Sequence, residues 1–298
     1  MKKVLMTGST GFIGKRILNV LTRADDVDLT LITSHKVAGY KCLLHRNWKL
    51  SEKSISEKFD CLVLLGGVTP KGKNTDKEEH YIKNISSTIN VLDALKQLPP
   101  RVIFVSSVSV YEDCNIEISE DSQLTTQSLY GLSKIVSEKY LKCKCRERGA
   151  RLTILRLGPV YGPGEEIYNK IVGSFIKQAV NYGKICINSD GREKRNLIFV
   201  DDVARLIIAL ILSENIKDIG IVNVVSPNSI SVFELATEIV NNCIIKPDIY
   251  IANAKEGRSD LYSANKIMEI YKLLNLQFTS YEDGIAYTYS YFKEQGIE

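Results

Sequence analysis

The sequence predicts an α/β protein built on a doubly wound parallel sheet. Short apolar runs typical of buried strands recur at residues 3–7, 28–33, 60–65 and 102–105. Segments with helical periodicity separate them, and this alternation implies βαβ units whose strands lie parallel. The chain has 298 residues, of which 44% are hydrophobic and 25% charged, so it is long enough to bury a large core.

The first strand runs into a glycine-rich turn that opens a helix expected to reach about Arg23. Gly8 permits a tight turn, Gly11 lets a ligand approach the backbone, and Gly14 allows the helix to pack closely on the strand. Backbone N–H groups at the start of such a helix are suited to a pyrophosphate. The turn therefore predicts a dinucleotide site that is formed by Gly8, Thr10, Gly11, Phe12, Ile13 and Gly14.

The second strand ends without the carboxylate that usually binds the adenosine ribose hydroxyls of NAD. Ser34 and Lys36 stand there instead and offer a hydrogen bond and a positive charge to a 2′-phosphate. This end of the strand favours NADP over NAD. The alternative interpretation is that Lys36 is one solvated charge among many.

The third strand ends in Gly66 and Gly67, where small residues allow a cofactor to lie against the backbone. A helix is expected from about Glu78 to Leu98. Its apolar residues at helical spacing predict a face that is buried in the core or in a dimer interface, and they are Ile82, Ile85, Ile89, Leu92 and Leu95.

Chemistry-bearing side chains follow the fourth strand. Ser106 and Ser107 lie at its carboxyl end, the edge at which parallel sheets bind ligands. Tyr130 and Lys134 are four residues apart at the start of an amphipathic segment, so on a helix they share one face. A cation beside a tyrosine favours the phenolate, and the hydroxyl can then exchange a proton with a carbonyl or carbinol.

Taken together, these motifs resemble the extended short-chain dehydrogenase/reductase family, and more narrowly its nucleotide-sugar epimerase/dehydratase branch. The resemblance covers nearly the whole chain and includes the later stretch Arg156-Leu157-Gly158-Pro159-Val160-Tyr161-Gly162-Pro163-Gly164. It implies a Rossmann-type sheet with a smaller, interleaved C-terminal substrate-binding lobe. It also implies that Ser107 is the catalytic serine, Tyr130 the acid/base and Lys134 a cation that binds the cofactor ribose. Asn84 takes the place of a structural or cofactor-proximal asparagine.

The resemblance also names residues for a nucleotide-diphosphate sugar. Arg195, in the stretch from Gly191 to Ala204, takes the place of an arginine that clamps the diphosphate, a role for which a guanidinium fork is well suited. Arg258 resembles a second phosphate-binding arginine, and Ser109 joins Ser107 as a substrate contact. Pro159 departs from the family, because many sugar-nucleotide members carry an asparagine there.

Two interleaved domains are expected. Residues 1–165 and about 197–228 are predicted to form the dinucleotide-binding domain, and about 166–196 with 229–298 the substrate lobe. The helix carrying Tyr130 and the one from about Glu78 to Leu98 resemble the paired dimer helices of the family, so a homodimer is expected.

Composition excludes several other classes. The formal net charge of +4, without a cluster of basic and aromatic residues, argues against nucleic acid as a partner. The longest apolar run is too short to cross a bilayer, and the first residues do not resemble a signal peptide. Seven scattered cysteines indicate reduced thiols in a cytoplasmic protein. Cys143 and Cys145 lack an accompanying histidine, so no metal site is expected.

Several reactions remain open at this stage. Family 4,6-dehydratases carry an Asp-Glu pair just after the catalytic serine, and Val108 and Ser109 stand there instead. This argues against dehydration. Because no acid stands at the end of the second strand, we favour NADPH-dependent reduction of the C4 keto group of a nucleotide-linked 4-keto-6-deoxyhexose, in deoxysugar biosynthesis for a surface polysaccharide or glycoside. An NAD-dependent C4 epimerase is the alternative. A non-catalytic regulatory module that binds a dinucleotide is a third hypothesis, which the presence of both Tyr130 and Lys134 disfavours.

Overall fold

The computed structural model describes residues 1–21, 26–46, 49–50, 54–69, 77–111, 117–165, 170–214 and 219–296. The contacts of the chain divide it into two compact units. The first comprises Met1–Glu112, Glu120–Leu157 and Ala204–Asn223, and the second Asp113–Ser119, Gly158–Val203 and Val224–Glu298.

The first unit is built on an eight-stranded sheet with the order β12-β7-β6-β5-β1-β2-β3-β4. Neighbouring strands pair in parallel from β7 through β6, β5, β1 and β2 to β3, and β4 pairs antiparallel with β3. The fold class expected from the sequence is confirmed. The strands are β1 (Lys2–Thr7), β2 (Val27–Thr33), β3 (Lys41–Arg46), β4 (Lys49–Leu50), β5 (Cys61–Leu64), β6 (Arg101–Ser107), β7 (Arg151–Leu157) and β12 (Ile221–Val224).

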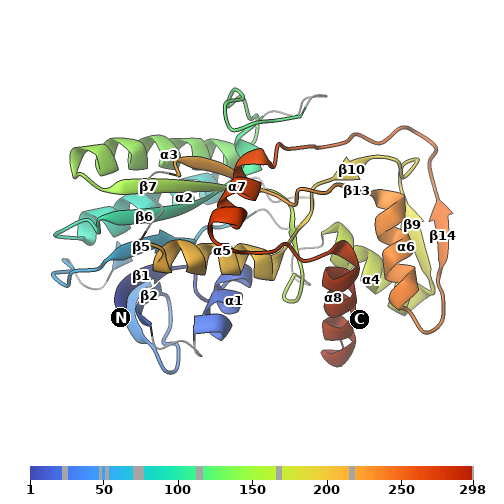
Figure 1. Ribbon diagram of the computed structural model, residues 1–298, viewed down its shortest axis with the longest axis horizontal. Coiled ribbons are helices and arrows are strands. Elements are labelled where there is room, and N and C mark those ends of the chain that lie inside the picture. The colour runs from blue at the N-terminus through green and yellow to red at the C-terminus, as the bar shows by residue number, and fades with distance from the viewer. Residues whose placement is uncertain are drawn as a thin grey trace. The chain divides into compact units, whose positions relative to one another are not determined.

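The sheet is doubly wound because the chain leaves β1 in both directions. The β1-to-β2 connection runs one way through α1 (Phe12–Leu21), and the chain then returns to β5 on the other side of β1. Right-handed crossovers therefore place α1 and α2 (Glu78–Ala94) on opposite faces of the sheet. The first unit also contains α3 (Leu129–Glu147) and most of α5 (Val200–Leu212) (Figure 1). The carboxyl ends of β1, β5 and β6 thus meet at one edge.

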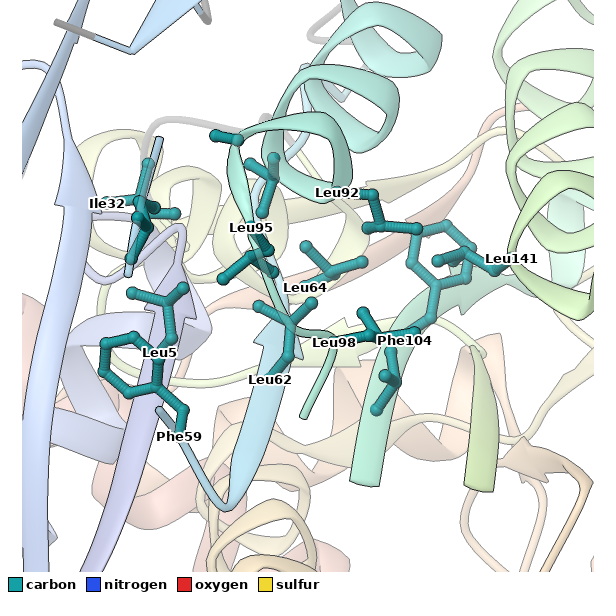
Figure 2. Close-up of a cluster of buried hydrophobic side chains, with 14 of the residues drawn as sticks. Leu5, Ile32, Phe59, Leu62, Leu64, Leu92, Leu95, Leu98, Phe104 and Leu141 are labelled. Carbon is teal, nitrogen blue, oxygen red and sulfur yellow. The ribbon is translucent and has the colours of Figure 1, made fainter. Parts of the chain in front are cut away.

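The core of this unit lies between the sheet and the pair α2 and α3. Figure 2 shows Leu64 and Phe104 of the strands beside Leu92 of α2 and Leu141 of α3, and Leu5 and Leu62 belong to the same cluster farther along the sheet. Burial of such side chains contributes about 1.5–3 kcal/mol each relative to exposure. This packing holds α2 and α3, and the side chains at their sheet-edge ends, in a defined register on the sheet.

Helix α2 differs from expectation in two ways. It ends at Ala94 rather than near Leu98, because Leu95 is extended and the chain there pairs with Ile55, whose N–H donates to the Ala94 carbonyl at 2.6 Å. In its first turns the expected apolar face is not buried in the core of this chain, since Ile82 is 52% exposed, and its place in a dimer interface stays a prediction. The helix instead buries small polar residues beside α3, among them Asn84, Ser87 and Thr88. The expected end of α1 near Arg23 lies outside the described residues.

The second unit is a smaller α/β assembly. Strand β9 (Lys184–Ile187) pairs in parallel with β14 (Asp248–Ile251), and helices α4 (Ile171–Tyr182), α6 (Val232–Asn242) and α8 (Tyr281–Glu294) pack with them. Ser231 and Glu234 form a capping box at the start of α6. The remaining elements are β8 (Val160–Tyr161), β10 (Lys194–Arg195), β11 (Ile198–Phe199), β13 (Ile230–Ser231) and α7 (Asn265–Leu273).

The two units do not follow the expected domain boundaries throughout. Residues 158–165, 197–203 and 224–228, which we assigned to the dinucleotide-binding domain, cluster with the second unit. Short strand pairs explain this, since β8 pairs with β11, and β10 pairs with β13. The assignment of a cofactor role to one unit and a substrate role to the other stays a prediction.

Candidate active site

The glycine turn after β1 has the backbone geometry that the sequence predicts. Gly8 has φ +74°, and a Cβ built on it would lie 2.6 Å from the Gly66 nitrogen, so the carboxyl ends of β1 and β5 touch through their glycines. The Gly11 N–H donates to the Gly8 carbonyl at 3.1 Å and closes the turn. A Cβ on Gly14 would lie 2.1 Å from the Gly8 oxygen. Only glycine allows this close packing of α1 on the turn.

This turn fits a dinucleotide pyrophosphate. Helix α1 begins at Phe12, directly after the turn, so its first N–H groups point toward the sheet edge. Thr10 and Gly11 are exposed, and Phe12 and Ile13 are half-buried. The cradle therefore combines accessible backbone donors with the positive end of a helix dipole.

The end of β2 carries no acid. The strand ends at Thr33, and Ser34 and Lys36 follow it as exposed residues. The Ser34 hydroxyl lies 3.2 Å from Nδ1 of His35. Hydroxyl, imidazole and ammonium groups at this position are suited to an anion, which keeps a 2′-phosphate among the candidate ligands.

Asn84 of α2 joins the segment after β5 to α3. Its Oδ1 accepts from the Val68 N–H at 2.7 Å, while its Nδ2 donates to the Val68 carbonyl at 3.0 Å and to Ser133 Oγ at 3.2 Å. A Cβ on Gly67 would lie 3.3 Å from Asn84 Oδ1 and 3.4 Å from Lys134 Nζ. Asn84 therefore fixes the loop after β5 close to the lysine.

The two serines at the end of β6 are both buried, at 2% and 9% exposed, but their hydroxyls have different partners. Ser106 is buried, and its hydroxyl donates to Glu138 Oε1 at 2.6 Å. Ser107 begins a 3₁₀ turn over Val108–Val110, and its Oγ accepts from the Ser109 N–H at 3.1 Å. The Ser107 and Ser109 hydroxyls also lie 3.1 Å apart. Ser107 is thus the serine at the edge of the sheet, and Ser109 lies beside it.

Helix α3 presents the expected tyrosine and lysine on one face. Ser128 caps the helix by accepting from the Gly131 N–H at 2.9 Å. Lys134 Nζ lies 5.7 Å from the centroid of the Tyr130 ring and donates to the Val105 carbonyl at 2.9 Å. A Cβ on Gly131 would lie 2.1 Å from the Ser109 carbonyl oxygen. The start of α3 therefore contacts the Ser107–Ser109 turn directly.

Burial sets the protonation of Lys134. Desolvation lowers its pKa to about 8, and the nearby Glu138 carboxylate opposes this by raising it. The ammonium is therefore present at neutral pH and is lost as the pH rises above about 8. At neutral pH a charged Lys134 therefore lies 5.7 Å from the centroid of the Tyr130 ring.

A pH prediction follows from this lysine. If the Lys134 ammonium is needed, kcat/KM falls as the pH rises through about 8, because the free enzyme then loses that proton. The measurement is kcat/KM between pH 6 and 10 with circular dichroism at each pH. Replacement of the exposed Lys139 on the same helix by alanine leaves the profile unchanged. A flat profile to pH 10 in a folded protein contradicts the role.

The two predicted phosphate-binding arginines lie together in the second unit. Arg195 Nε is 3.5 Å from Asp260 Oδ2, and Arg258 Nε is 3.9 Å from Asp260 Oδ1. Arg195 Nη1 also donates to the Arg258 carbonyl. Their stretches run side by side, since the Asp260 N–H donates to the Lys194 carbonyl at 3.2 Å. Asp260 thus orients two cations that the sequence separates by more than sixty residues.

Sequence reasoning missed four residues that build these sites. Glu138 and Arg156 form a buried ion pair behind the serine turn, Gly131 sets the distance between α3 and that turn, and Asp260 joins the arginines. A signal existed for Glu138, since it lies four residues after Lys134 and so on the same helical face. Asp260 stands two residues after Arg258, but its other partner, Arg195, is distant in the sequence, so no local pattern pointed to this contact.

None of the helices in the described part of the chain combines the length and hydropathy needed to cross a bilayer. The histidine, cysteine and acidic side chains of the same residues form no group of three or more that could hold a metal ion.

The chain is similar to known proteins that are named as nucleotide-sugar enzymes. A protein of Methanocaldococcus jannaschii named for UDP-glucose 4-epimerase activity is 27% identical over 270 residues, which cover 85% of this chain and 87% of that protein. The dTDP-4-dehydro-6-deoxyglucose reductase of Escherichia coli is 26% identical over 254 residues, or 78% of this chain and 79% of the reductase.

The fold has solved counterparts as well. The UDP-glucuronic acid 4-epimerase of Bacillus cereus, crystallised with UDP-glucuronic acid and NAD, superposes with a TM-score of 0.81 at 20% identity over 98% of this chain and 99% of that one. At this identity the likeness is evidence of the fold alone. The family model described as "NAD dependent epimerase/dehydratase family" matches residues 4–224, which include the glycine turn, Ser107, Tyr130 and Lys134. The chain is therefore an enzyme of the NAD dependent epimerase/dehydratase family.

Proposed function

We propose that the protein transfers a hydride to and from C4 of a nucleotide-diphosphate sugar. The observation that carries the proposal is the convergence of three groups at one sheet edge. Lys134 is bound to the Val105 carbonyl, Tyr130 lies one turn before it, and the start of α3 touches the turn of Ser107. The glycine turn at the end of β1 supplies a pyrophosphate cradle at the same edge.

Each residue has a distinct task in this mechanism. A nicotinamide dinucleotide, when bound, supplies the hydride acceptor and donor. Tyr130 takes the proton from the C4 hydroxyl during oxidation, and returns it to the C4 oxygen during reduction. Lys134 favours the tyrosinate electrostatically and offers N–H donors to the cofactor ribose, while Ser107 donates a hydrogen bond to the same sugar oxygen. Alignment at this edge supplies the rest of the rate enhancement.

Elimination of water is not supported by the residues after Ser107. A dehydratase needs an acid and a base near the leaving hydroxyl, whereas Val108 is buried and Ser109 pairs its hydroxyl with Ser107. The chemistry that remains is oxidation and reduction at one carbon, with one proton exchanged at Tyr130.

Epimerisation at C4 is the first candidate for the net reaction. In it the sugar is oxidised, turned and reduced on its other face, so the cofactor is regenerated in each cycle. The Methanocaldococcus jannaschii relative, which is named as a UDP-glucose 4-epimerase, supports this assignment. Regeneration also places no demand on the cellular ratio of oxidised to reduced cofactor.

Reduction of a 4-keto sugar with NADPH is the second candidate, and the end of β2 favours it. Ser34 and Lys36 replace the carboxylate that would repel a 2′-phosphate. The Escherichia coli relative is named as a reductase of a nucleotide-linked 4-keto-6-deoxysugar. A place in deoxysugar synthesis for a surface polysaccharide or glycoside follows from this candidate.

One pair of assays separates the two candidates. Purified protein with catalytic NAD and a panel of UDP- and dTDP-hexoses is analysed by NMR for the C4 epimer. The same protein with NADPH and nucleotide 4-keto-6-deoxyhexoses is followed by loss of absorbance of the reduced cofactor. An epimer without net cofactor consumption supports the epimerase, and stoichiometric NADPH oxidation supports the reductase. No turnover in either panel contradicts the proposed function.

Loss of Arg195 is expected to weaken substrate binding selectively. In Arg195→Ala the KM for the nucleotide sugar rises at least about tenfold, because a charge-assisted hydrogen bond to a phosphate is lost, while the Kd for NADH is unchanged. Steady-state kinetics and NADH fluorescence measure the two quantities. Arg192→Ala removes an exposed arginine of the same loop and serves as control. An unchanged KM in Arg195→Ala argues against a diphosphate at this position.

A homodimer through α2 and α3 is part of the proposal. Both helices expose apolar side chains, Ile82 on α2 and Leu132 and Val136 on α3, which a second copy of the chain would cover. Light scattering after size exclusion measures the mass. We expect a dimer for the natural chain and a monomer for Val136→Asp, and a natural chain of monomer mass contradicts the assignment.

A further inference from the structure

An ion pair buried behind the candidate active site carries no role in the mechanism above. Glu138 of α3 and Arg156 of β7 are each 1% exposed, and Arg156 is the largest fully buried side chain in the described residues. Their contact is bidentate, with Arg156 Nη2 donating to Glu138 Oε2 at 2.8 Å and Nε to Oε1 at 3.1 Å. Well-packed apolar residues often serve stability as well as such a pair does, so its presence calls for another explanation.

The acidic member of the pair reaches the strand that carries Ser107. Glu138 Oε1 also accepts from the hydroxyl of Ser106, the residue directly before Ser107, at 2.6 Å. One turn earlier on the same helix, Lys134 Nζ donates to the Val105 carbonyl at 2.9 Å. Two successive turns of α3 are therefore bound to two successive residues at the end of β6.

The basic member reaches the other end of the serine turn. Arg156 Nη1 donates to the Tyr111 hydroxyl at 2.7 Å, and its guanidinium lies 5.0 Å from the centroid of the Tyr111 ring. Tyr111 closes the 3₁₀ turn that begins at Ser107, because its N–H donates to the Val108 carbonyl at 3.0 Å. The Tyr111 hydroxyl in turn donates to Asn223 Oδ1 at 2.8 Å. The pair thus holds the serine turn from both sides.

The same carboxylate is the charged partner of Lys134. Burial lowers the pKa of Lys134 to about 8, and Glu138 is the group whose charge raises it. The other groups around the ammonium are the Tyr130 ring on α3, the Val105 carbonyl and Phe104 ring on β6, Gly67 after β5 with Asn84 of α2 beside it, and Arg156 of β7 beyond Glu138. Loss of the Glu138 charge therefore makes the ammonium less stable at a given pH.

We propose that Glu138 and Arg156 are positioning residues that hold the Ser107 turn in register with Tyr130 and Lys134, and that Glu138 also supplies the counter-charge of Lys134. Neither residue touches substrate or cofactor. The inference rests on the proposed function for its kinetic effect. The structural part of the proposal is that the pair joins α3, β6 and β7, and this part depends only on contacts within the first unit.

Two variants test the charge and the packing separately. Glu138→Gln keeps the shape but removes the charge, whereas the double variant Glu138→Leu/Arg156→Met replaces both ions by apolar groups and is expected to unfold at or above the temperature of the natural protein. In both, kcat falls at least about tenfold with a smaller change in KM, because the serine turn loses its register. In both, the pH at which kcat/KM falls on the alkaline side decreases by about one pH unit.

A milder variant and a control keep the test informative if the double variant does not fold. Ser106→Ala removes a single hydroxyl and is expected to lower kcat several-fold without changing the pH of the alkaline fall. Ser137→Ala removes a buried hydroxyl that bonds only to the Ser133 carbonyl of its own helix, and it leaves kcat unchanged. A folded double variant with the kcat and the alkaline pH dependence of the natural protein overturns the proposal. The proposal is also overturned if Ser106→Ala has the kcat of the natural protein and, in addition, the alkaline fall in the rate of Glu138→Gln occurs at the same pH as in the natural protein.

Cofactor binding distinguishes a failure of this proposal from a failure of the proposed function. NADH affinity of the natural protein, followed by fluorescence, is expected to fall as Lys134 loses its proton, and the midpoint of that fall moves down in Glu138→Gln. This readout needs no sugar substrate. If the natural protein turns over no nucleotide sugar but the midpoint moves, the proposed function fails and the role of Glu138 toward Lys134 stands. An unmoved midpoint contradicts that role regardless of substrate.

Discussion

Tyr130→Phe is expected to lower kcat by about 10²–10⁴-fold, because the variant has no hydroxyl to exchange a proton with the sugar oxygen. The ring itself is retained, so its place one turn before Lys134 is kept. KM for the nucleotide sugar and Kd for NADH are expected to change little. Steady-state kinetics at the optimal pH, together with NADH fluorescence, measure these quantities.

The control for this variant is Tyr140→Phe. Tyr140 lies on the same helix and packs at the edge of the core of the first unit, away from the sheet edge that carries Ser107. Its loss of a hydroxyl is expected to leave kcat unchanged. Turnover by Tyr130→Phe at the natural rate would show that another group transfers the proton.

Gly131→Ala is the second large effect that we expect. The new Cβ would lie 2.1 Å from the Ser109 carbonyl oxygen and 2.4 Å from Thr126 Oγ1, so α3 and the serine turn must separate. A displacement of about 1 Å between catalytic groups lowers rates by about 10²-fold. We therefore expect kcat to fall by that order, although alanine is the better helix former. Kinetics with thermal unfolding of the same sample tests this.

The contrast with Lys139→Ala makes the result specific. That substitution places alanine at an exposed position of the same helix and is expected to leave both kcat and the unfolding temperature nearly unchanged. If Gly131→Ala unfolds near the natural temperature and keeps its kcat, the helix start does not need to contact the serine turn. If it unfolds earlier and its kcat per folded molecule is normal, the contact serves stability alone.

Local patterns were sufficient for the features that depend on near neighbours. Gly8, Gly11 and Gly14 predict the turn because backbone approach and left-handed φ values are properties of single residues. The spacing of Tyr130 and Lys134 predicts a shared face because helix geometry repeats every 3.6 residues. The alternation of strands and helices likewise predicts the parallel sheet.

Local sequence patterns did not predict the partners or the burial of individual side chains. Ser106 and Ser107 are adjacent residues of the same type, and local patterns do not show that the Ser106 hydroxyl donates to the buried carboxylate of Glu138 while Ser107 Oγ accepts from the Ser109 N–H. The apolar residue Ile82 is exposed although its spacing matches a buried stripe, because α2 packs small polar residues against α3 at this level. Such outcomes depend on which element lies opposite, and that is a tertiary property.

The sequence by itself determined the fold class, the glycine turn and the shared helical face of Tyr130 and Lys134, since each follows from backbone conformation or helical period within a few residues. The tertiary structure alone decided that the Ser106 hydroxyl binds Glu138, that Arg195 and Arg258 meet at Asp260, and that Glu138 and Arg156 form a buried ion pair behind the serine turn. Those contacts join residues far apart in the chain, and their partners are set by how the strands and helices pack, not by any local preference.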